Sequence, residues 1–547
     1  MIAKSTIEKF QDQINKILTD KKHQIELVGY IAVFLIYLFT HLINLVEYPS
    51  FHGDEMFYVL KAVIWKKTGT PSMPDWDGNY RPEFTNPSTL SWIYMVLFDI
   101  FGTTPLIQRL VMLIIGIINL LFVFLVGREI GGTEKPRFGY LIGILAGLLL
   151  ALDQEFICYS RTGYLDNPMN LCLTISLYFF LQYLRTENQN YTWVAGFAAG
   201  IAFWFKLSAC YFLIGLALFA LITRKIDAFL RIQAVITLFL GLFVLWGFSI
   251  DPVVFVKGIT FQLNRAPSGF TLANEPFPPL LWMLYWLHFA LYDYGGPNFD
   301  LFRILIFFSI FIPIYYIRKR NSLFNEKSFL VVCLLLGAII FFSMTKSLYV
   351  FYAAGFMSFF GILFGCSTLI AITLGKNLQN TLIQYPSSSP DYQRWLKRGL
   401  RGGLLLIFFL ALILKFILAI YIPTTVIENF NPSLNVEFRS TPSFFSLSTE
   451  NLDVLEILSY VQQEIPVRET FVASTEIGPW LNASGYNVYV IGYINQSPPD
   501  FVVREYIQMN VPHYIVLHKD YQYIIQDLEY TIFYVTATYK IWRGKET

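Results

Sequence analysis

Two adjacent carboxylates, Asp54 and Glu55, follow the first long apolar stretch of the chain, residues 26–46, by only a few positions. A chain that has just crossed a bilayer would carry both carboxylates at the membrane surface. A carboxylate placed there can take the proton of a hydroxyl group as that hydroxyl attacks an electrophile. Acidic residues are also common in the first turn of a helix, where they complement its dipole. The pair by itself leaves both interpretations open.

Four further charged residues flank apolar stretches at the same predicted depth. Arg161 and Asp166 enclose the sequence Thr-Gly-Tyr-Leu, whereas Lys206 and Lys346 stand at the ends of later stretches. A lone lysine such as Lys206 usually extends its charge towards water. Charges near a bilayer are costly and tend to face a cavity or one another. Six of them converging on one leaflet therefore predict a site.

Group transfer from a lipid phosphate is the chemistry that suits such a site. A polyprenyl-phosphate sugar keeps its tail in the bilayer and its phosphate at the headgroup level, where arginine and lysine would hold it. The cations, with Arg265 from a later loop as a further candidate, would stabilise the charge left on the departing phosphate. A carboxylate would act as general base on the acceptor hydroxyl. The loops predicted to be cytoplasmic hold no Rossmann or P-loop motif for a soluble sugar nucleotide.

Composition places most of the chain in a membrane. Of the 547 residues, 55% are hydrophobic, 18% are aromatic and 14% are charged, against about a quarter charged in soluble proteins. The net charge of +2 argues against a nucleic-acid partner. The five cysteines lie in apolar stretches without the spacing of a metal site.

Eleven apolar stretches are long enough to be membrane-helix candidates. They lie near residues 26–46, 104–126, 138–157, 167–184, 192–206, 208–223, 232–250, 302–317, 328–344, 350–374 and 402–422. Lysine and arginine are about twice as frequent in alternate loops, which predicts a cytoplasmic N-terminus and an extracytoplasmic C-terminal region. The predicted fold class is an α-helical polytopic membrane protein.

Three segments on the predicted outer side are long enough to contribute to a site: residues 47–103, 251–301 and 423–547. In the first, Met56–Lys67 has apolar residues on one face and Lys61, Lys66 and Lys67 off it, which predicts a helix lying in the interface. The last has the composition of a soluble domain, with helix-like and strand-like runs that indicate a small α/β fold. We therefore expect a membrane domain over residues 1–424 and an α/β domain over residues 425–547.

The motifs and their order resemble the GT-C glycosyltransferases, in particular the protein O-mannosyltransferases and the lipid A aminoarabinose transferases. They are the Asp-Glu pair, Arg-x-x-x-x-Asp-Asn from Arg161, Gly-x-x-Phe-x-x-Lys ending at Lys206, and Lys-x-x-Tyr from Lys346 to Tyr349. The resemblance covers roughly residues 25–425. It implies that Asp54 is the catalytic base, that Asp166 and Arg161 belong to the site, and that Lys206, Lys346 and Tyr349 lie near the lipid phosphate.

The chain also departs from these families. Aminoarabinose transferases show Glu-Lys-Pro-Pro where this chain has Phe84–Ser88, which argues against lipid A transfer. Asp75 and Asp77 could bind a divalent cation or could simply form a turn, so a metal requirement stays open. A transporter or flippase of lipid-linked substrates is the alternative function, although such proteins usually carry charges near the bilayer midplane. The sugar (hexose- or mannose-like) and the acceptor (protein, lipid or glycan) are not specified.

Overall fold

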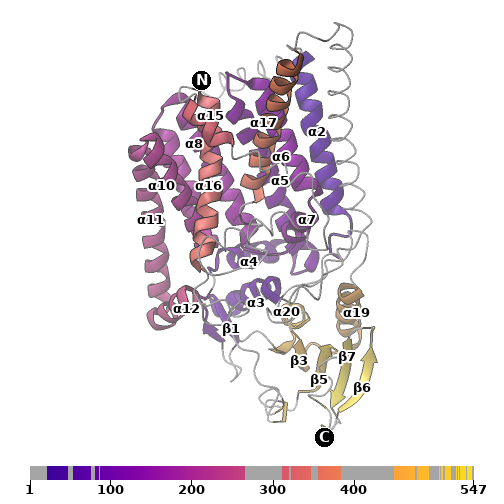
Figure 1. Ribbon diagram of the computed structural model, residues 1–547. Helices are drawn as coiled ribbons and strands as arrows, with labels where there is room; N and C mark the ends of the chain where they lie inside the picture. The colour runs from indigo at the N-terminus through magenta and orange to yellow at the C-terminus, as the bar shows by residue number, and fades with distance from the viewer. Residues whose placement is uncertain are drawn as a thin grey trace, which may run out of the picture.

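A bundle of helices with a five-stranded sheet at one end makes up the described part of the chain (Figure 1). We refer to that end of the bundle as the sheet end. The computed structural model describes residues 21–46, 53–74, 80–85, 87–264, 311–318, 322–345, 355, 357–383, 449–474, 477–491, 504, 507–508, 512–518, 525, 528, 530–537 and 539–544.

Long apolar helices form the bundle. They include α2 (Lys21–Leu42), α5 (Pro105–Gly131), α6 (Pro136–Leu152), α8 (Asp166–Thr186), α9 (Asn190–Phe205), α10 (Cys210–Thr223), α11 (Ile226–Ile250), α15 (Phe311–Arg318), α16 (Leu323–Thr345) and α17 (Met357–Ile383). Among the described helices, α2, α5, α11, α16 and α17 each contain a segment long and apolar enough to cross a membrane. The predicted total of eleven spans stays a prediction, since the stretch 402–422 lies outside the described residues.

One predicted span is wrong in its extent. The stretch 138–157 reads as a single helix, but α6 ends at Leu152 and a separate short helix, α7 (Gln154–Arg161), follows it. Between them Asp153 lies in extended backbone, and its Oδ1 accepts a hydrogen bond from the backbone N–H of Phe156 at 3.0 Å. This is the geometry of a helix N-cap, which starts a new helix in a new direction.

Glycines let neighbouring bundle helices approach closely. A Cβ atom on Gly127 of α5 would lie 2.4 Å from the backbone nitrogen of Gly143 in α6. A Cβ on Gly337 of α16 would lie equally close to the backbone nitrogen of Gly215 in α10. Small residues at such crossings are typical of membrane helices, where packing rather than water drives association.

At the end of the bundle away from the sheet, Glu134 joins two parts of the chain. Its carboxylate accepts hydrogen bonds from Ser322 Oγ (2.9 Å) and from the backbone N–H groups of Leu323 and Phe324 (3.0 and 3.3 Å). It therefore caps the N-terminus of α16 from the loop between α5 and α6. Partial burial raises the pKa of Glu134, but these hydrogen bonds outweigh it and hold the pKa below its ordinary value.

Short elements cover the sheet end. They are α3 (Gly53–Thr68), the antiparallel strands β1 (Ser72–Pro74) and β2 (Tyr80–Pro82), α4 (Thr89–Phe101), the 3-10 helix η1 (Leu207–Ala209) and α12 (Pro252–Asn264). In Figure 1, α4 and α3 lie across the end of the bundle, between it and the sheet. The prediction of an interfacial α3 is wrong in one respect. Most of residues 55–64 are buried, because α4 packs on one side of the helix and the C-terminal region on the other.

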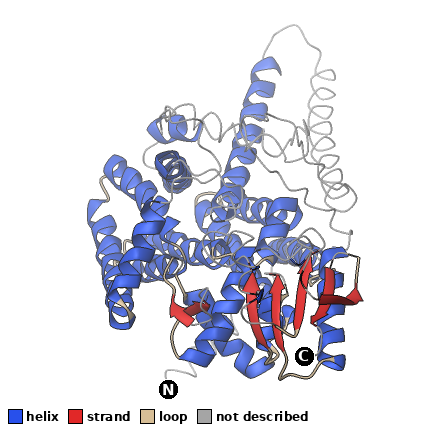
Figure 2. Ribbon diagram, turned by 90° about the horizontal axis from the view of Figure 1, so that it is seen from below, coloured by secondary structure: helices blue, strands red, loops and turns tan. Residues whose placement is uncertain are grey.

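The C-terminal sheet region confirms the predicted α/β character. Helix α19 (Thr449–Glu464) precedes a sheet in the order β4-β3-β5-β7-β6, and Figure 2 shows the strands side by side. The strands are β3 (Thr470–Ser474), β4 (Asn487–Ile491), β5 (Tyr514–His518), β6 (Tyr530–Val535) and β7 (Tyr539–Gly544), and helix α20 (Gly478–Ala483) connects β3 to β4. Strand β3 is parallel to β4 and β5, whereas β7 is antiparallel to β5 and β6.

Strands β6 and β7 form a hairpin. Thr536 closes its turn, because its backbone N–H donates to the carbonyl of Tyr539 and its Oγ1 accepts from the Tyr539 N–H, both at 3.0 Å. Both faces of the central strand β3 are buried, whereas the edge strand β6 is largely exposed. The consecutive residues Phe471 and Val472 belong to separate apolar clusters, because successive side chains of a strand point to opposite faces of the sheet.

The apolar cluster that contains Phe471 continues into α3 and the bundle, so the described core is not interrupted between bundle and sheet. The boundary near residue 424 lies outside the described residues, and the division into two domains stays a prediction.

Candidate active site

Glu55 is anchored by an arginine that the sequence pattern does not single out. The Glu55 side chain is fully buried, and Arg109 of α5 holds it with two contacts: Nε lies 2.8 Å from Oε1, and Nη2 donates to Oε2 at 2.9 Å. The Arg109 side chain is fully buried as well. A buried carboxylate needs such compensation, and the planar guanidinium supplies it in a fixed geometry. The pair fixes the start of α3 to the start of α5.

Gly163 completes the surroundings of Glu55. Its backbone N–H donates to Glu55 Oε1 at 3.2 Å. A Cβ atom at this position would lie 2.8 Å from the hydroxyl oxygen of Tyr94, 2.9 Å from Gln108 Nε2 and 3.2 Å from Glu55 Cγ. The glycine of the Thr-Gly-Tyr-Leu sequence is therefore required by close packing around a buried carboxylate.

Tyr94 of α4 is the neutral member of this group. Burial raises the pKa of Tyr94 well above its ordinary value, and the Glu55 carboxylate raises it further. The phenol therefore keeps its proton. It is not a base.

Asp166 and Lys206, predicted to lie at the same depth, are in direct contact. Asp166 stands in the first turn of α8, where a carboxylate complements the helix dipole, and Lys206 follows the last residue of α9. Lys206 Nζ donates to Asp166 Oδ2 at 2.6 Å, with the lysine side chain 20% exposed and the aspartate 2%. Lys206 also stands where the chain turns from α9 into η1, in extended backbone. The lysine charge is thus held in place by a buried carboxylate.

Arg161 ends α7 and is buried. Its Nη2 donates a hydrogen bond to the carbonyl of Ile43, just beyond the end of α2. Beside it, His41 Nε2 lies 2.9 Å from Ser160 Oγ, and Thr40 Oγ1 donates to the carbonyl of Ala151 at 2.9 Å. This polar layer links α2, α6 and α7 and fixes the segment that carries Arg161.

The sequence pattern predicts the wrong environment for Lys61 of α3. The sequence pattern places Lys61 off the apolar face, yet its side chain is fully buried and its Nζ lies 2.6 Å from Glu83 Oε2. Burial lowers the pKa of Lys61, and the Glu83 carboxylate opposes that effect. Glu83 also accepts a hydrogen bond from the Thr85 backbone N–H at 2.5 Å. Lys61 thus connects α3 to the segment after β2, and only the last turn of the helix exposes its lysines.

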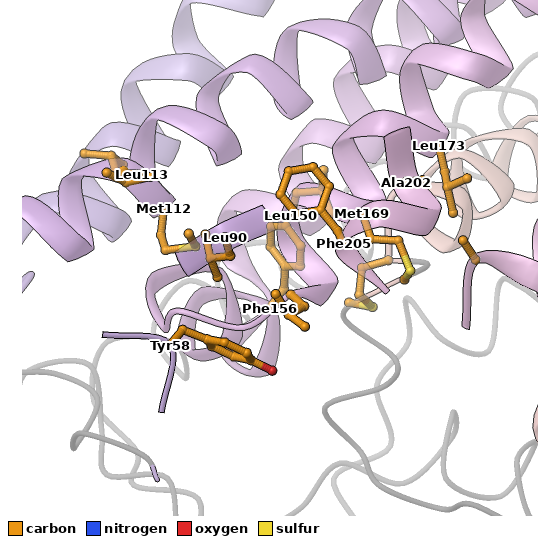
Figure 3. Close-up of a cluster of buried hydrophobic side chains, with 14 of the residues drawn as sticks. Tyr58, Leu90, Met112, Leu113, Leu150, Phe156, Met169, Leu173, Ala202 and Phe205 are labelled. Carbon is orange, nitrogen blue, oxygen red and sulfur yellow. The ribbon is translucent and has the colours of Figure 1, made fainter. Parts of the chain in front are cut away.

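An apolar layer beneath these groups brings their helices together. Figure 3 shows side chains from several helices in one buried cluster at the sheet end. Tyr58 of α3, Leu90 of α4, Met112 of α5, Phe156 of α7 and Met169 of α8 are among them. Residues that are distant in the sequence therefore meet around a common core.

Several predicted site residues lie partly or wholly outside the described part of the structure. The backbone of Asp54 lies in the first turn of α3, but its side chain lies outside the described part of the structure. Arg265, Lys346 and Tyr349 also lie outside the described residues, as do Asp75 and Asp77. Within the described ranges, no group of three or more His, Cys, Asp or Glu residues is arranged to hold a metal ion. The metal requirement therefore stays open.

Comparisons with known proteins agree with the motifs. A family model described as dolichyl-phosphate-mannose-protein mannosyltransferase matches residues 85–250, a range that includes Arg109, Arg161, Asp166 and Lys206. An uncharacterized protein from Aquifex aeolicus (strain VF5) is 24% identical over 253 residues. That alignment spans 45% of this chain and 48% of the relative, so the chain matches about half of its length.

Solved structures show the same fold. ArnT from Cupriavidus metallidurans in the apo state matches with a TM-score of 0.60 and 14% identity, over 94% of this chain and 98% of that one. The same protein bound to undecaprenyl phosphate matches with a TM-score of 0.53 and 15% identity, over 94% of this chain and 97% of that one. The oligosaccharyltransferase AglB from Archaeoglobus fulgidus, in complex with an inhibitory peptide and a dolichol-phosphate, matches with a TM-score of 0.50 and 13% identity, over 91% of this chain and 70% of that one. The chain has the fold of the GT-C glycosyltransferases, and the resemblance seen in its motifs is confirmed at that level.

Proposed function

We propose that this integral membrane protein is a glycosyltransferase that moves a sugar from a polyprenyl-phosphate donor to an acceptor hydroxyl on the outer face of the membrane. The fold and the mannosyltransferase family model support the class of enzyme. ArnT binds undecaprenyl phosphate and AglB a dolichol-phosphate and a peptide, which supports a lipid-phosphate donor and leaves protein, lipid and glycan acceptors as candidates. We infer a hexose or mannose-like sugar from the family description alone.

The observation that carries the proposal is the arrangement at the sheet end. Helix α3 starts with two carboxylates, and α8 starts with a third that contacts Lys206. Arg161 ends the short helix between them in sequence and is held from α2. Acids and cations supported by one buried apolar layer suit general-base catalysis beside a phosphate.

We assign the donor phosphate to the cations. Arg161 and Lys206 are positioned by hydrogen bonds to Ile43 and Asp166, and Arg265, Lys346 and Tyr349 complete the proposed phosphate site. Asp166 orients Lys206 until the phosphate arrives, so its contribution to catalysis is indirect. Hydrogen bonds between these cations and the phosphate oxygens would stabilise the charge that builds up as the lipid phosphate leaves.

Asp54 is the proposed base. Neighbours on a helix point about 100° apart, so a Glu55 held by Arg109 leaves Asp54 on a different side of α3. The acceptor hydroxyl gives its proton to Asp54 while its oxygen attacks the anomeric carbon. The bond from that carbon to the phosphate oxygen breaks, and polyprenyl phosphate leaves with the electron pair. Attack opposite the leaving group inverts the anomeric centre. Glu55 then acts on the reaction by fixing the first turn of α3.

Release of polyprenyl phosphate by the purified protein tests this function. A transferase produces it in proportion to the glycosylated acceptor, whereas a transporter or flippase moves the intact lipid and releases none. Asp54→Asn keeps the side-chain shape and removes the base, so turnover should fall about 100- to 10,000-fold while donor binding survives. Turnover at the normal rate in Asp54→Asn would refute the assignment of the base, and an acceptor that is already an anion would then be the better explanation. Chelator treatment in the same assay decides the metal requirement.

A further inference from the structure

Two consecutive lysines in the last turn of α3 contact different parts of the protein. Lys66 pairs with Asp99 of α4, and both side chains are more than half exposed. Lys67 Nζ donates instead to Asn482 of α20, at 2.5 Å from Oδ1 and 3.4 Å from the backbone carbonyl oxygen. The same turn of one helix is therefore joined both to the bundle and to the C-terminal sheet region.

Asn482 belongs to the sequence Asn-Ala-Ser, which reads as a glycosylation sequon on an outer segment. In the structure Asn482 is only 2% exposed. Ser484 is also engaged, since its Oγ donates to the Trp480 carbonyl at 2.9 Å and accepts from Gln462 Nε2 at 2.9 Å. A buried amide has a strong requirement for a partner, which Lys67 satisfies. The folded protein thus uses this sequon as a contact and does not present it for modification.

Helix α20 is seated firmly on the sheet. A Cβ atom on Gly478 would lie 2.6 Å from Val490 Cγ2 of β4, so the start of α20 has no room to shift towards the strand. Trp480 and Leu481 are buried in the same apolar cluster that contains Met56 of α3. Figure 1 shows α20 beside α3, between that helix and β3. A displacement of the sheet region would therefore reach α3 through α20.

We propose that the contact between Lys67 and Asn482 is a positioning contact through which the C-terminal sheet region fixes α3, and with it Asp54. Asp54 and Lys67 stand at opposite ends of one helix, about 20 Å apart along its axis. Glu55 holds the first end to α5 through Arg109, and Asn482 holds the second. A helix fixed at only one end can tilt, and misplacement of a catalytic group by about 1 Å can cost about 100-fold in rate.

Three variants of the full-length protein test the contact. Asn482→Leu removes the acceptor at similar volume, Asn482→Asp keeps an acceptor for Lys67, and Lys67→Met removes the donor at a partly exposed position. We expect Asn482→Leu and Lys67→Met to lower kcat about tenfold with a change of less than about twofold in the KM for the donor, and Asn482→Asp to retain most of the rate. The double variant Lys67→Met/Asn482→Leu should be no slower than the worse single variant.

Lys66→Met serves as the matched control, because it removes the neighbouring lysine from an exposed pair and should leave kcat unchanged. Hydrogen exchange provides a readout that is independent of catalysis. Backbone amides of α20 and of the last turns of α3 should exchange at least about tenfold faster in Asn482→Leu and Lys67→Met than in the wild type. Their exchange should be unchanged in Lys66→Met. If Asn482→Leu does not fold, the partly exposed Lys67→Met carries the test.

The activity half of the test rests on the proposed function, and the two can fail separately. Normal turnover in Asp54→Asn would overturn the assignment of the base, while hydrogen exchange would still report whether α20 holds α3. Faster exchange with unchanged kcat would overturn the positioning role. Equal losses of kcat in Lys67→Met and Lys66→Met would overturn it as well, because the effect would then come from charge on the helix end and not from contact with Asn482.

Discussion

Removing one partner of the Glu55–Arg109 pair should be far more damaging than removing both. Each side chain is fully buried, and two contacts of 2.8 and 2.9 Å join them. Arg109→Met leaves the Glu55 carboxylate buried without its guanidinium partner, although the Gly163 N–H still donates to it. Breaking a buried pair in this way typically costs about 3–5 kcal/mol, because one charge loses its compensation. Glu55→Gln should cost a similar amount, since it strands the guanidinium.

The double variant Glu55→Gln/Arg109→Met removes both charges and keeps comparable volumes, so it should recover most of that loss. Thermal unfolding in detergent, followed for the wild type, the two single variants and the double variant, measures the coupling. Lys66→Met again provides the control, at an exposed pair whose loss should cost at most about 1 kcal/mol. If either single variant is as stable as that control, the pair does not fix α3. If the losses of the single variants simply add in the double variant, the two side chains do not depend on each other.

Three further predictions concern other contacts in the described structure. Gly163→Ala adds a Cβ within 2.8–3.2 Å of three neighbouring side chains and should lower stability by about 1–3 kcal/mol, which thermal unfolding checks; an unaffected midpoint would show that the site has spare room. Arg161→Met and Lys206→Met should each weaken binding of a lipid phosphate about tenfold or more in a binding assay on folded protein, and unchanged affinity in both would remove the cations from the donor site. The pKa of Glu134 is depressed in the folded protein, so its contribution to stability is present above about pH 4.5 and is lost as the pH falls through the folded pKa. Glu134→Gln should therefore remove part of the loss of stability at acid pH. Identical profiles of stability against pH for the variant and the wild type would contradict this.

Local sequence properties were enough to locate the long apolar helices that the structure describes. The helices α5, α11 and α16 overlap runs whose length and apolar composition alone suit a bilayer. The strands of the C-terminal region, such as β4, agree with the strand-like runs expected there. The break between α6 and α7 was missed, since hydropathy averages over Asp153 while the backbone responds to its capping hydrogen bond.

Partners across the chain could not be predicted in the same way. Arg109 stands near the start of an apolar helix, and a charge in that setting is itself a signal that a partner exists. Nothing in the pattern tells which carboxylate, 54 residues away in the sequence, will meet it. Lys61 was placed on the wrong face for the same reason, because a lysine on a helix surface is normally solvated unless another segment brings a carboxylate to it. The segment after β2 brings Glu83, and that approach depends on the tertiary fold.

The anchoring of Glu55 bears directly on the choice between the two adjacent carboxylates. A carboxylate that accepts two contacts from a buried guanidinium and one from a backbone N–H has most of its acceptor positions filled. Taking a proton from an acceptor hydroxyl would require it to give up one of those contacts and to reach a substrate from a site without solvent access. Asp54 occupies the neighbouring position on the same turn, rotated by about 100° from Glu55. Fixing Glu55 therefore fixes the direction of Asp54, which is why we assign the base to Asp54 and the positioning role to Glu55.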